Sequence, residues 1–283
     1  MMFDWENSDD EIPPFERDVT LDETVICQSL DRFGDITIDL TVDLADITLD
    51  KTIERVDGEA LDGGLCSCVS LDRLNTRIIS KLPFSYDMEQ TLKGRRRLDS
   101  LKEFSDRLGR SFKSNGRCFT YLLLDPRILN NLAERAKKTP LSDLETLRQF
   151  ATGIFYVGKG QSFRPYAHLE DAIIKRGAGG PKNQVINSIW RAGYGVIALH
   201  LWHGQCSSEA LAREASIIEA IGLNRLTNEK SGWLKPPIST WPPKERRLLG
   251  VELIRLACQR ILIDGERQIK ASDVFSLNTC HSK

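Results

Sequence analysis

The chain has 283 residues, of which 41% are hydrophobic and 7% aromatic, enough for one large domain or for a medium-sized domain with additional segments. No apolar stretch is long enough to predict a membrane span. The net charge of −1 conceals a division, because residues 1–60 hold 18 acidic and 4 basic residues and residues 61–283 hold 22 acidic and 35 basic ones. An acidic arm on a basic body is typical of nucleic-acid-binding proteins, although a soluble enzyme with a solvated tail has the same charge pattern.

The cysteines indicate reduced thiols rather than a disulfide framework. No two of them form a CxxC pair, and Cys66 and Cys68 are one residue apart, which suits neither a zinc site nor a bridge. The acidic N-terminus lacks the basic and apolar regions of a secretory signal. We therefore expect a protein of the nucleus or the cytoplasm. The seven cysteines occupy positions 27, 66, 68, 118, 206, 258 and 280.

Residues 1–60 are expected to form a disordered acidic arm, because they hold many charges and few aromatic residues. Within them, apolar and polar residues alternate at period two over 35–50, which predicts a strand. Such a strand can add to the sheet edge of a partner, and its ITIDL and TVDL pieces resemble motifs that bind small ubiquitin-like modifiers. A solvated acidic tail is the alternative interpretation.

Residues 61–116 are interpreted as a basic linker with helical character. The basic cluster at 93–97 fits a nuclear-import signal, a phosphate-contacting patch or solvated surface charge. Large apolar residues at helical spacing predict a helix over Leu98–Leu108 that ends at Gly109.

Residues 117–230 combine predicted strands and helices, which indicates an α+β domain. Residues 127–150 are expected to form an insert of one or two helices on the surface between the first two strands. The predicted strands are Cys118–Leu124, Gly153–Val157 and Gly195–Trp202, and the predicted helices are Pro165–Arg176, Asn183–Ala192 and Ser207–Ile221, the last of which ends at Gly222.

Residues 231–283 are predicted to form a helical extension and a tail. Apolar residues at helical spacing indicate a strongly amphipathic helix over 244–262, and the last residues are expected to fray.

The motif YVGKG at Tyr156–Gly160 places Lys159 between two glycines at the end of a strand. Because Gly158 and Gly160 leave the backbone unshielded, this turn can approach a phosphate closely. Many strands end in this way, so the motif alone does not establish a function.

Arg164 and His168 are four residues apart and therefore share one face of the predicted helix. Arginine holds phosphate through two donors, and histidine transfers protons near neutral pH. An ordinary solvated helix face has the same spacing.

Glu214 lies within EALAREASIIEAIG, close to the apolar side of its helix. A carboxylate near a buried face needs a partner, and either a divalent metal ion or a surface arginine would serve.

Taken in order, these motifs resemble those of the GIY-YIG nucleases over about 112 residues. The stretches YLLLDPR, FYVGKGQSFRPYAHL and EALAREASIIEAIG are similar to the ankyrin-repeat and LEM-domain endonucleases of animals. The sequence has Phe119 and Thr120 where the family name has Gly-Ile, and Val157 where it has Ile. We detect no ankyrin repeat or LEM domain, so the targeting functions of those modules are not assumed. The ordered set is Phe119–Tyr121, Phe155–Gly158, Gly158–Arg164, Glu214 and Leu226–Asn228.

The resemblance implies a small mixed sheet flanked by helices, with the catalytic residues on one face. Glu214 would ligate one Mg²⁺ or Mn²⁺ ion that stabilises charge on the scissile phosphate. Arg164 would neutralise phosphate charge in the transition state. Tyr121 and Tyr156 would orient or activate the attacking water, and the sequence does not choose between them. Two buried tyrosines with satisfied hydroxyls are the alternative.

The other implied roles concern support and substrate contact. His168 is a candidate proton carrier, and Asn228 would brace the site. Lys159, with Gly158 and Gly160, would contact the DNA backbone.

The sequence therefore predicts a metal-dependent endonuclease that hydrolyses DNA phosphodiester bonds. The resemblance implies branched or bridging DNA as substrate, in DNA repair or chromosome segregation. The alternatives are a non-catalytic DNA-binding module that retains the fold and a protein-interaction adaptor that works through the acidic arm.

Overall fold

The computed structural model describes residues 82–113, 116–139, 141–162, 164–175 and 179–274. The predicted acidic arm and its strand at 35–50 lie outside the described residues, as does the end of the predicted C-terminal tail. The domain boundaries at 60, 116 and 230 stay predictions.

A four-stranded sheet organises the described residues, in the spatial order β2-β1-β3-β4. Tyr121 lies on the central strand β1, where it pairs with Gly158 on one side and His200 on the other. The predicted α+β fold with a small flanked sheet is confirmed, but each neighbouring pair is antiparallel, so the sheet is not mixed. Antiparallel neighbours need no crossover helix between them. The strands are β1 (Cys118–Leu124), β2 (Ile154–Gly160), β3 (Val196–Gln205) and β4 (Gln268–Ile269).

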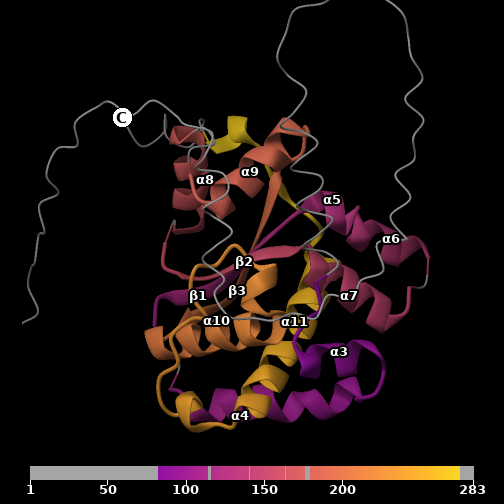
Figure 1. The fold of residues 1–283 in the computed structure, drawn as a ribbon, viewed down its shortest axis with the longest axis vertical. Coiled ribbons are helices and arrows are strands. Elements are labelled where there is room, and N and C mark those ends of the chain that lie inside the picture. Colours follow the sequence, from indigo (N-terminus) through magenta and orange to yellow (C-terminus); the bar gives the residue numbers. More distant parts are fainter. Residues whose placement is uncertain (1–81, 114–115, 140, 163, 176–178, 275–283) are drawn as a thin grey trace, which may run out of the picture. The chain divides into compact units, whose positions relative to one another are not determined.

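Helices cover both faces of the sheet, which is why every residue of β1 is buried. Leu122 and Leu124 belong to one hydrophobic cluster, and Tyr121 and Leu123 belong to another on the opposite face. Figure 1 shows α8 and α9 on one side of the sheet and α10 and α11 on the other. These helices are α8 (Arg164–Ile174), α9 (Pro181–Arg191), α10 (Ser207–Ile221) and α11 (Pro243–Asp264).

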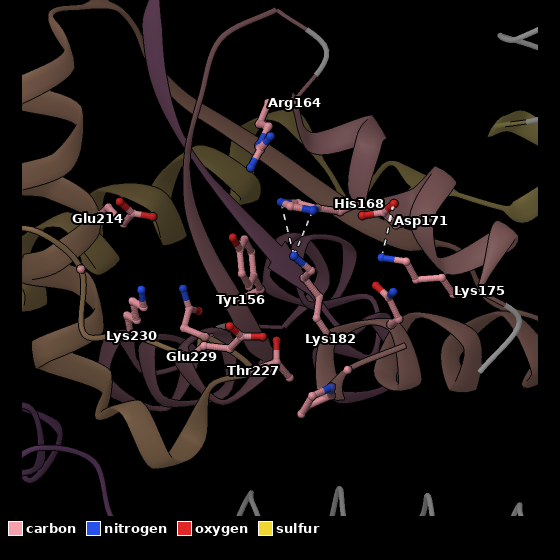
Figure 2. Close-up of a pocket in the computed structure, with 15 residues that line it drawn as sticks. Tyr156, Arg164, His168, Asp171, Lys175, Lys182, Glu214, Thr227, Glu229 and Lys230 are labelled. Carbon is pink, nitrogen blue, oxygen red and sulfur yellow. Dashed lines mark hydrogen bonds and ion pairs between the residues drawn. The ribbon is translucent and has the colours of Figure 1, made fainter. Parts of the chain in front are cut away.

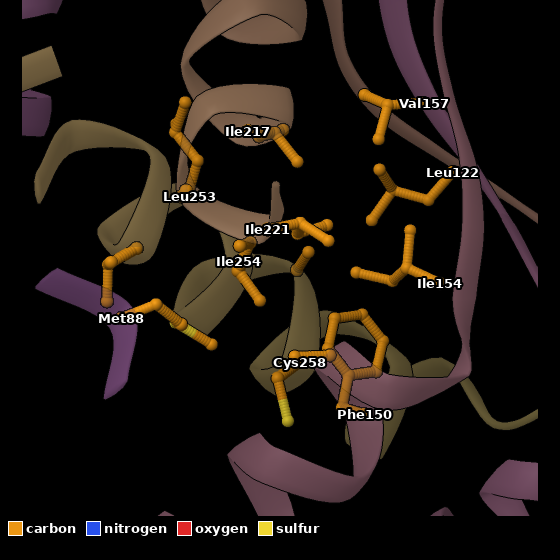
Figure 3. Close-up of a cluster of buried hydrophobic side chains, with 14 of the residues drawn as sticks. Met88, Leu122, Phe150, Ile154, Val157, Ile217, Ile221, Leu253, Ile254 and Cys258 are labelled. Carbon is orange, nitrogen blue, oxygen red and sulfur yellow. The ribbon is translucent and has the colours of Figure 1, made fainter. Parts of the chain in front are cut away.

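The insert between β1 and β2 is part of the core and not a surface addition as predicted. Phe150 is fully buried and lies in the same cluster as Leu122 and Ile221 (Figure 3). The described residues of the insert also form three helices rather than one or two. Left-handed backbone conformations at Asn130 and Asn131 separate the first helix from the second, and the second ends at Lys138 before the third begins at Asp143. The helices are α5 (Pro126–Leu129), α6 (Leu132–Lys138) and α7 (Asp143–Gly153).

The helix predicted over 244–262 is present as α11, but it is a central core helix and not the amphipathic extension that was predicted. The consecutive residues 248–254 are all buried, which leaves this segment no solvent-facing side. It crosses α10 so closely that a Cβ atom added to Gly250 would overlap the carbonyl oxygen of Ser216. Such a crossing requires tertiary contacts that helical spacing does not reveal.

The remaining elements either precede β1 or follow α10 along the chain. Helix α3 was not predicted, and the helix predicted over Leu98–Leu108 begins as a 3₁₀ turn and continues through Gly109, which faces open space. Cys118, Cys206 and Cys258 are free thiols. No helix in the described part of the chain is long and apolar enough to span a membrane. These elements are α3 (Tyr86–Leu92), η2 (Leu98–Leu101), α4 (Lys102–Ser111), η3 (Leu223–Arg225) and η4 (Ile238–Thr240).

Candidate active site

One pocket of about 480 Å³ collects most of the predicted site residues (Figure 2). They come from β2, from α8, from α10 and from the loop after η3, so residues far apart in sequence meet at one place. The predicted residues that line this pocket are Tyr156, Arg164, His168, Glu214 and Asn228.

Tyr121 lies behind the pocket and not in its wall. Its side chain is 1% exposed, and its hydroxyl lies 2.7 Å from Nε2 of His168. Its ring centroid is 6.0 Å from that of Tyr156, and the two phenols lie close enough to shift each other's pKa. Tyr121 therefore reaches the pocket only through its neighbours.

Lys182 completes this cluster, although the sequence did not single it out. Its Nζ lies 2.9 Å from Nδ1 of His168 and 4.3 Å from the centroid of the Tyr156 ring. Figure 2 shows the ammonium group between these two side chains. The same Nζ lies 3.5 Å from Nε2 of His168, and because a charged lysine only donates, the shorter contact assigns Nδ1 as the acceptor.

Burial lowers the pKa values of both basic groups in this cluster. Burial, followed by the charges of Lys182 and Arg164, lowers the pKa of His168 to about 4. Burial also lowers the pKa of Lys182, to about 8. At neutral pH His168 is therefore an uncharged imidazole and Lys182 is mostly an ammonium ion.

These protonation states fix the direction of the hydrogen bonds. A neutral imidazole carries one N–H, and since Nδ1 accepts from Lys182, that proton is on Nε2 of His168. Nε2 then donates to the oxygen of Tyr121, which leaves the Tyr121 hydroxyl proton for the oxygen of Tyr156. The chain of donors thus runs from Lys182 to the phenol that lines the pocket.

The pKa values of the two phenols are raised by burial, and only Tyr156 has strong compensation. The hydrogen bond from Tyr121 and the charge of Arg164 both lower the pKa of Tyr156, while Glu214 raises it. A donated hydrogen bond stabilises a phenolate, so the arrangement favours deprotonation at Tyr156 over Tyr121.

Glu214 is held by the backbone of β2. Its Oε1 accepts from the backbone N–H of Lys159 at 3.2 Å, and burial raises its pKa while this hydrogen bond lowers it. Its other carboxylate oxygen has no hydrogen-bond partner among the described residues. The neighbouring Arg213 pairs instead with Glu209 at 2.8 Å, so an arginine partner for Glu214 is not present in the described region.

The two glycines of YVGKG have a packing role that the sequence did not predict. A Cβ atom on Gly158 would overlap the ring of Tyr121, and one on Gly160 would lie 2.9 Å from Cζ of Phe119. Neither glycine lines the pocket. The ammonium of Lys159 points to the start of α10, where it donates to Ser207 at 2.9 Å. Contact of these three residues with the DNA backbone stays a prediction.

Asn228 holds the edge strand β2 on its open side. Its side chain accepts from the N–H of Val157 at 3.0 Å and donates to the carbonyl of Val157 at 2.7 Å. Thr227 adds backbone and side-chain hydrogen bonds to the carbonyl of Phe155. This geometry is what the predicted bracing role requires.

Arg164 begins α8 at the mouth of the pocket. Its side chain is exposed, and its guanidinium makes no hydrogen bond or ion pair within the described part of the chain. It is therefore available to an external anion.

Glu214 is the most suitable metal ligand in the pocket. No group of three or more histidine, cysteine or acidic residues that could hold a metal ion occurs among the described residues. A single carboxylate with a free oxygen suits a hard ion such as Mg²⁺, which keeps several waters and shares substrate phosphates. The donor set fits Mg²⁺ or Mn²⁺ and does not fit a closed structural zinc site.

Sequence reasoning missed most of the charged residues around the pocket. Lys182 was hidden because it lies fourteen residues from His168, on a different helix, so no helical spacing connects them. Asp171 and Lys175 are four residues apart on one helix, a spacing from which an ion pair could have been predicted. In the structure, Nζ of Lys175 lies 3.8 Å from Oδ1 of Asp171. The missed charged residues are Asp171, Lys175, Lys182, Glu229 and Lys230.

The sequence was then compared with known proteins. Residues 118–276 match the family described as LEM-3-like GIY-YIG domain, which is more than half of the chain. The chain belongs to this family. The predicted resemblance to GIY-YIG nucleases is therefore confirmed, and membership of the LEM-3-like GIY-YIG family supports a nuclease-type function.

The relatives carry names that agree with this assignment. Ankyrin repeat and LEM domain-containing protein 1 of Mus musculus is 41% identical over 182 residues, which cover 63% of this chain and 33% of that protein. The Homo sapiens protein of the same name is 43% identical over 163 residues, which cover 55% of this chain and 26% of that protein. The Caenorhabditis elegans homolog is 35% identical over 167 residues, 56% of this chain and 22% of that protein.

The match spans about a third or less of the length of these curated relatives, so it concerns one region of each. The LEM-3-like GIY-YIG match also extends beyond residue 230 into α11 and β4. This agrees with the structure, in which α11 belongs to the core. No solved structure matches the chain.

Proposed function

We propose that this LEM-3-like GIY-YIG domain is a metal-dependent endonuclease that hydrolyses DNA phosphodiester bonds. The observation that carries the proposal is the convergence of Tyr156, Arg164 and Glu214 on one pocket. These side chains supply a proton acceptor, a free cation and a carboxylate around one cavity. Hydrolysis of a phosphodiester needs such groups held in place around the reacting phosphorus.

Glu214 would hold one Mg²⁺ or Mn²⁺ ion through its free carboxylate oxygen. When bound, the ion would stabilise negative charge on the scissile phosphate and on the leaving oxygen. The N–H of Lys159 keeps the carboxylate pointed at the pocket. Because Lys159 and Tyr156 belong to the same strand, this hydrogen bond fixes the position of the carboxylate relative to Tyr156.

Arg164 would bind the non-bridging oxygens of the phosphate. Its guanidinium is exposed and has no competing ion pair in the described region, and the planar fork of arginine matches phosphate geometry. The positive charge of Arg164 stabilises the transition state most, because negative charge on the phosphate oxygens increases there.

Tyr156 would orient the attacking water through its phenol oxygen, and it would take the proton of that water only as a phenolate, after its own hydroxyl proton had passed to solvent. It lines the pocket, whereas Tyr121 is fully buried behind it and reaches no solvent-accessible wall. Tyr121 supports Tyr156 by donating a hydrogen bond to its oxygen. His168 and Lys182 are positioning residues in this mechanism. His168 contacts the hydroxyl of Tyr121 and packs edge-on against the ring of Tyr156, with 5.2 Å between the ring centroids, and Lys182 places its charge over the Tyr156 ring.

The substrate and setting follow from the resemblance and belong to the same proposal. Branched or bridging DNA would be cut during DNA repair or chromosome segregation, in the nucleus or the cytoplasm. A non-catalytic DNA-binding module is the competing function, and a small-ubiquitin-like modifier remains a proposed partner of 35–50.

Cleavage by the full chain tests the proposal. Labelled four-way junction, flap and linear duplex DNA would be incubated with Mg²⁺, Mn²⁺ or EDTA, with wild-type protein, Glu214→Gln and Glu103→Gln. Glu103 is an exposed glutamate of α4 outside the pocket and serves as the matched control. We expect metal-dependent cutting by the wild type and the control and none by Glu214→Gln. Binding without cutting by the wild type in both metals would establish the competing function.

A further inference from the structure

Trp233 is an exposed aromatic side chain beside the candidate active site. Its side chain is 71% exposed, the preceding residue Gly232 lines the pocket, and Lys230 lines it as well. An indole in water forgoes the favourable free energy of burial. A position that keeps tryptophan exposed at a pocket edge is therefore a candidate ligand contact.

The loop that carries Trp233 is fixed on both sides of it. Gly232 has a φ of +85°, and a Cβ atom there would lie 2.8 Å from Cα of Ala215, so the loop backbone lies directly against α10. On the other side, Leu234 packs partly buried against the large hydrophobic cluster. Trp233 thus projects from an anchored backbone.

This anchoring connects the indole to the catalytic pocket. Ala215, which Gly232 contacts, directly follows Glu214, and the beginning of the same loop is held on β2 by Asn228. The position of the Trp233 backbone relative to Glu214 is therefore set by packed structure and does not depend on a ligand.

The surroundings of Trp233 suit a nucleic acid strand. The ammonium of Lys235 lies 5.6 Å from the centroid of the indole ring, and Lys230 provides a second cation towards the pocket. Aromatic side chains stack on nucleobases while adjacent basic residues follow the phosphate backbone. A paired base inside a duplex has both faces covered by its neighbours, so only an unpaired base offers a face to the indole.

We propose that Trp233 is a stacking site for an unpaired nucleobase adjacent to the phosphate that enters the pocket. This inference rests on the proposed function and deepens it, because it names DNA with unpaired bases near the cut as the preferred substrate class. Arg164 and the metal ion held by Glu214 would then bind the scissile phosphate, while Trp233 would stack on a base beside it.

Binding of the full chain in EDTA tests this site independently of cutting. Two DNA duplexes with identical ends would be used, one continuous and one with a short single-stranded gap, so that only unpaired bases differ. We expect Trp233→Leu to weaken binding to the gapped DNA about fivefold or more and to leave binding to the continuous duplex nearly unchanged. Trp233→Phe, which keeps an aromatic face, should retain most of the preference for gapped DNA.

Tyr86→Leu is the matched control. Tyr86 is 73% exposed on α3, which Figure 1 shows well away from α8 and α9, and its loss should leave both affinities unchanged. Equal weakening on both duplexes, or no weakening on the gapped one, would overturn the stacking proposal. Selective weakening together with absent cleavage in Mg²⁺ and Mn²⁺ would support the stacking site and refute only the nuclease activity.

Discussion

Replacing Lys182 by methionine tests the hydrogen-bonded cluster most directly. Methionine has a similar length, so the substitution removes the ammonium with little change in volume. In the structure the ammonium donates to Nδ1 of His168 at 2.9 Å and lies over the ring of Tyr156. Without this donor, His168 is free to place its proton on Nδ1, and it then no longer donates to Tyr121.

The size of the effect follows from the lost hydrogen bond. A hydrogen bond from a charged donor contributes about 1.5–3 kcal/mol, and the partial exposure of Lys182 favours the lower end. About 1.4 kcal/mol is a tenfold change in an equilibrium. We therefore expect the tautomer that donates to Tyr121 to lose about tenfold in preference, and cleavage by Lys182→Met to fall by a similar factor.

The pH dependence provides a second readout. Burial lowers the pKa of Lys182 to about 8, while Asp171 raises it and Arg164 lowers it further. The ammonium is present below that pH and is lost above it, and a neutral amine accepts hydrogen bonds as well as donating them. The ratio of the wild-type rate to the Lys182→Met rate should therefore decrease as pH rises through about 8. Lys182→Arg should restore part of the rate without this decrease, because arginine stays charged.

Nitrogen NMR of the histidine side chains and cleavage rates across pH are the assays. His168→Gln identifies the His168 signals among those of the four histidines in the chain. Lys175→Met, which removes a cation paired with Asp171 at 3.8 Å, is the matched control and should leave the His168 tautomer unchanged. An unchanged Nε2–H tautomer in Lys182→Met, with pH profiles parallel to those of the wild type, would refute the reasoning.

Two further predictions concern stability. Gly250→Ala should lower the free energy of unfolding by about 1–3 kcal/mol, because the added methyl overlaps Ser216, whereas Gly109→Ala in open space should raise it by about 0.5–1 kcal/mol. Urea denaturation checks both, and equal effects would contradict the close crossing of α10 and α11. His168 is 6% exposed and titrates at about 4 when folded but near 6.5 when unfolded, so the unfolded state binds the extra proton between these values. The free energy of unfolding should therefore fall by up to about 3 kcal/mol as pH decreases from 6.5 to 4. His168→Gln should remove this loss, whereas the control His203→Gln, at an exposed histidine, should not.

Local sequence determined the main elements and the identity of several candidate site residues. A run of aromatic and aliphatic residues predicted β1 with the observed bounds, and helical periodicity with Gly222 predicted α10 with its observed bounds. The ordered motifs assigned Tyr156, Arg164 and Glu214 to one site through the family resemblance, because these residues lie on β2, α8 and α10 and no spacing within one element connects them.

Tertiary packing decided the rest. Helix α11 reads as amphipathic, yet residues 248–254 are enclosed because several helices pack around it, and no pattern within α11 specifies those partners. Lys182 and Trp233 likewise lie near the pocket only because α9 packs beside α8 and because Gly232 lies against α10. Periodicity reports which residues share a face of their own element, whereas contacts between elements depend on the shape of the surfaces that pack together. The chemistry of this site therefore depends on residues from separate elements that only the folded chain brings together.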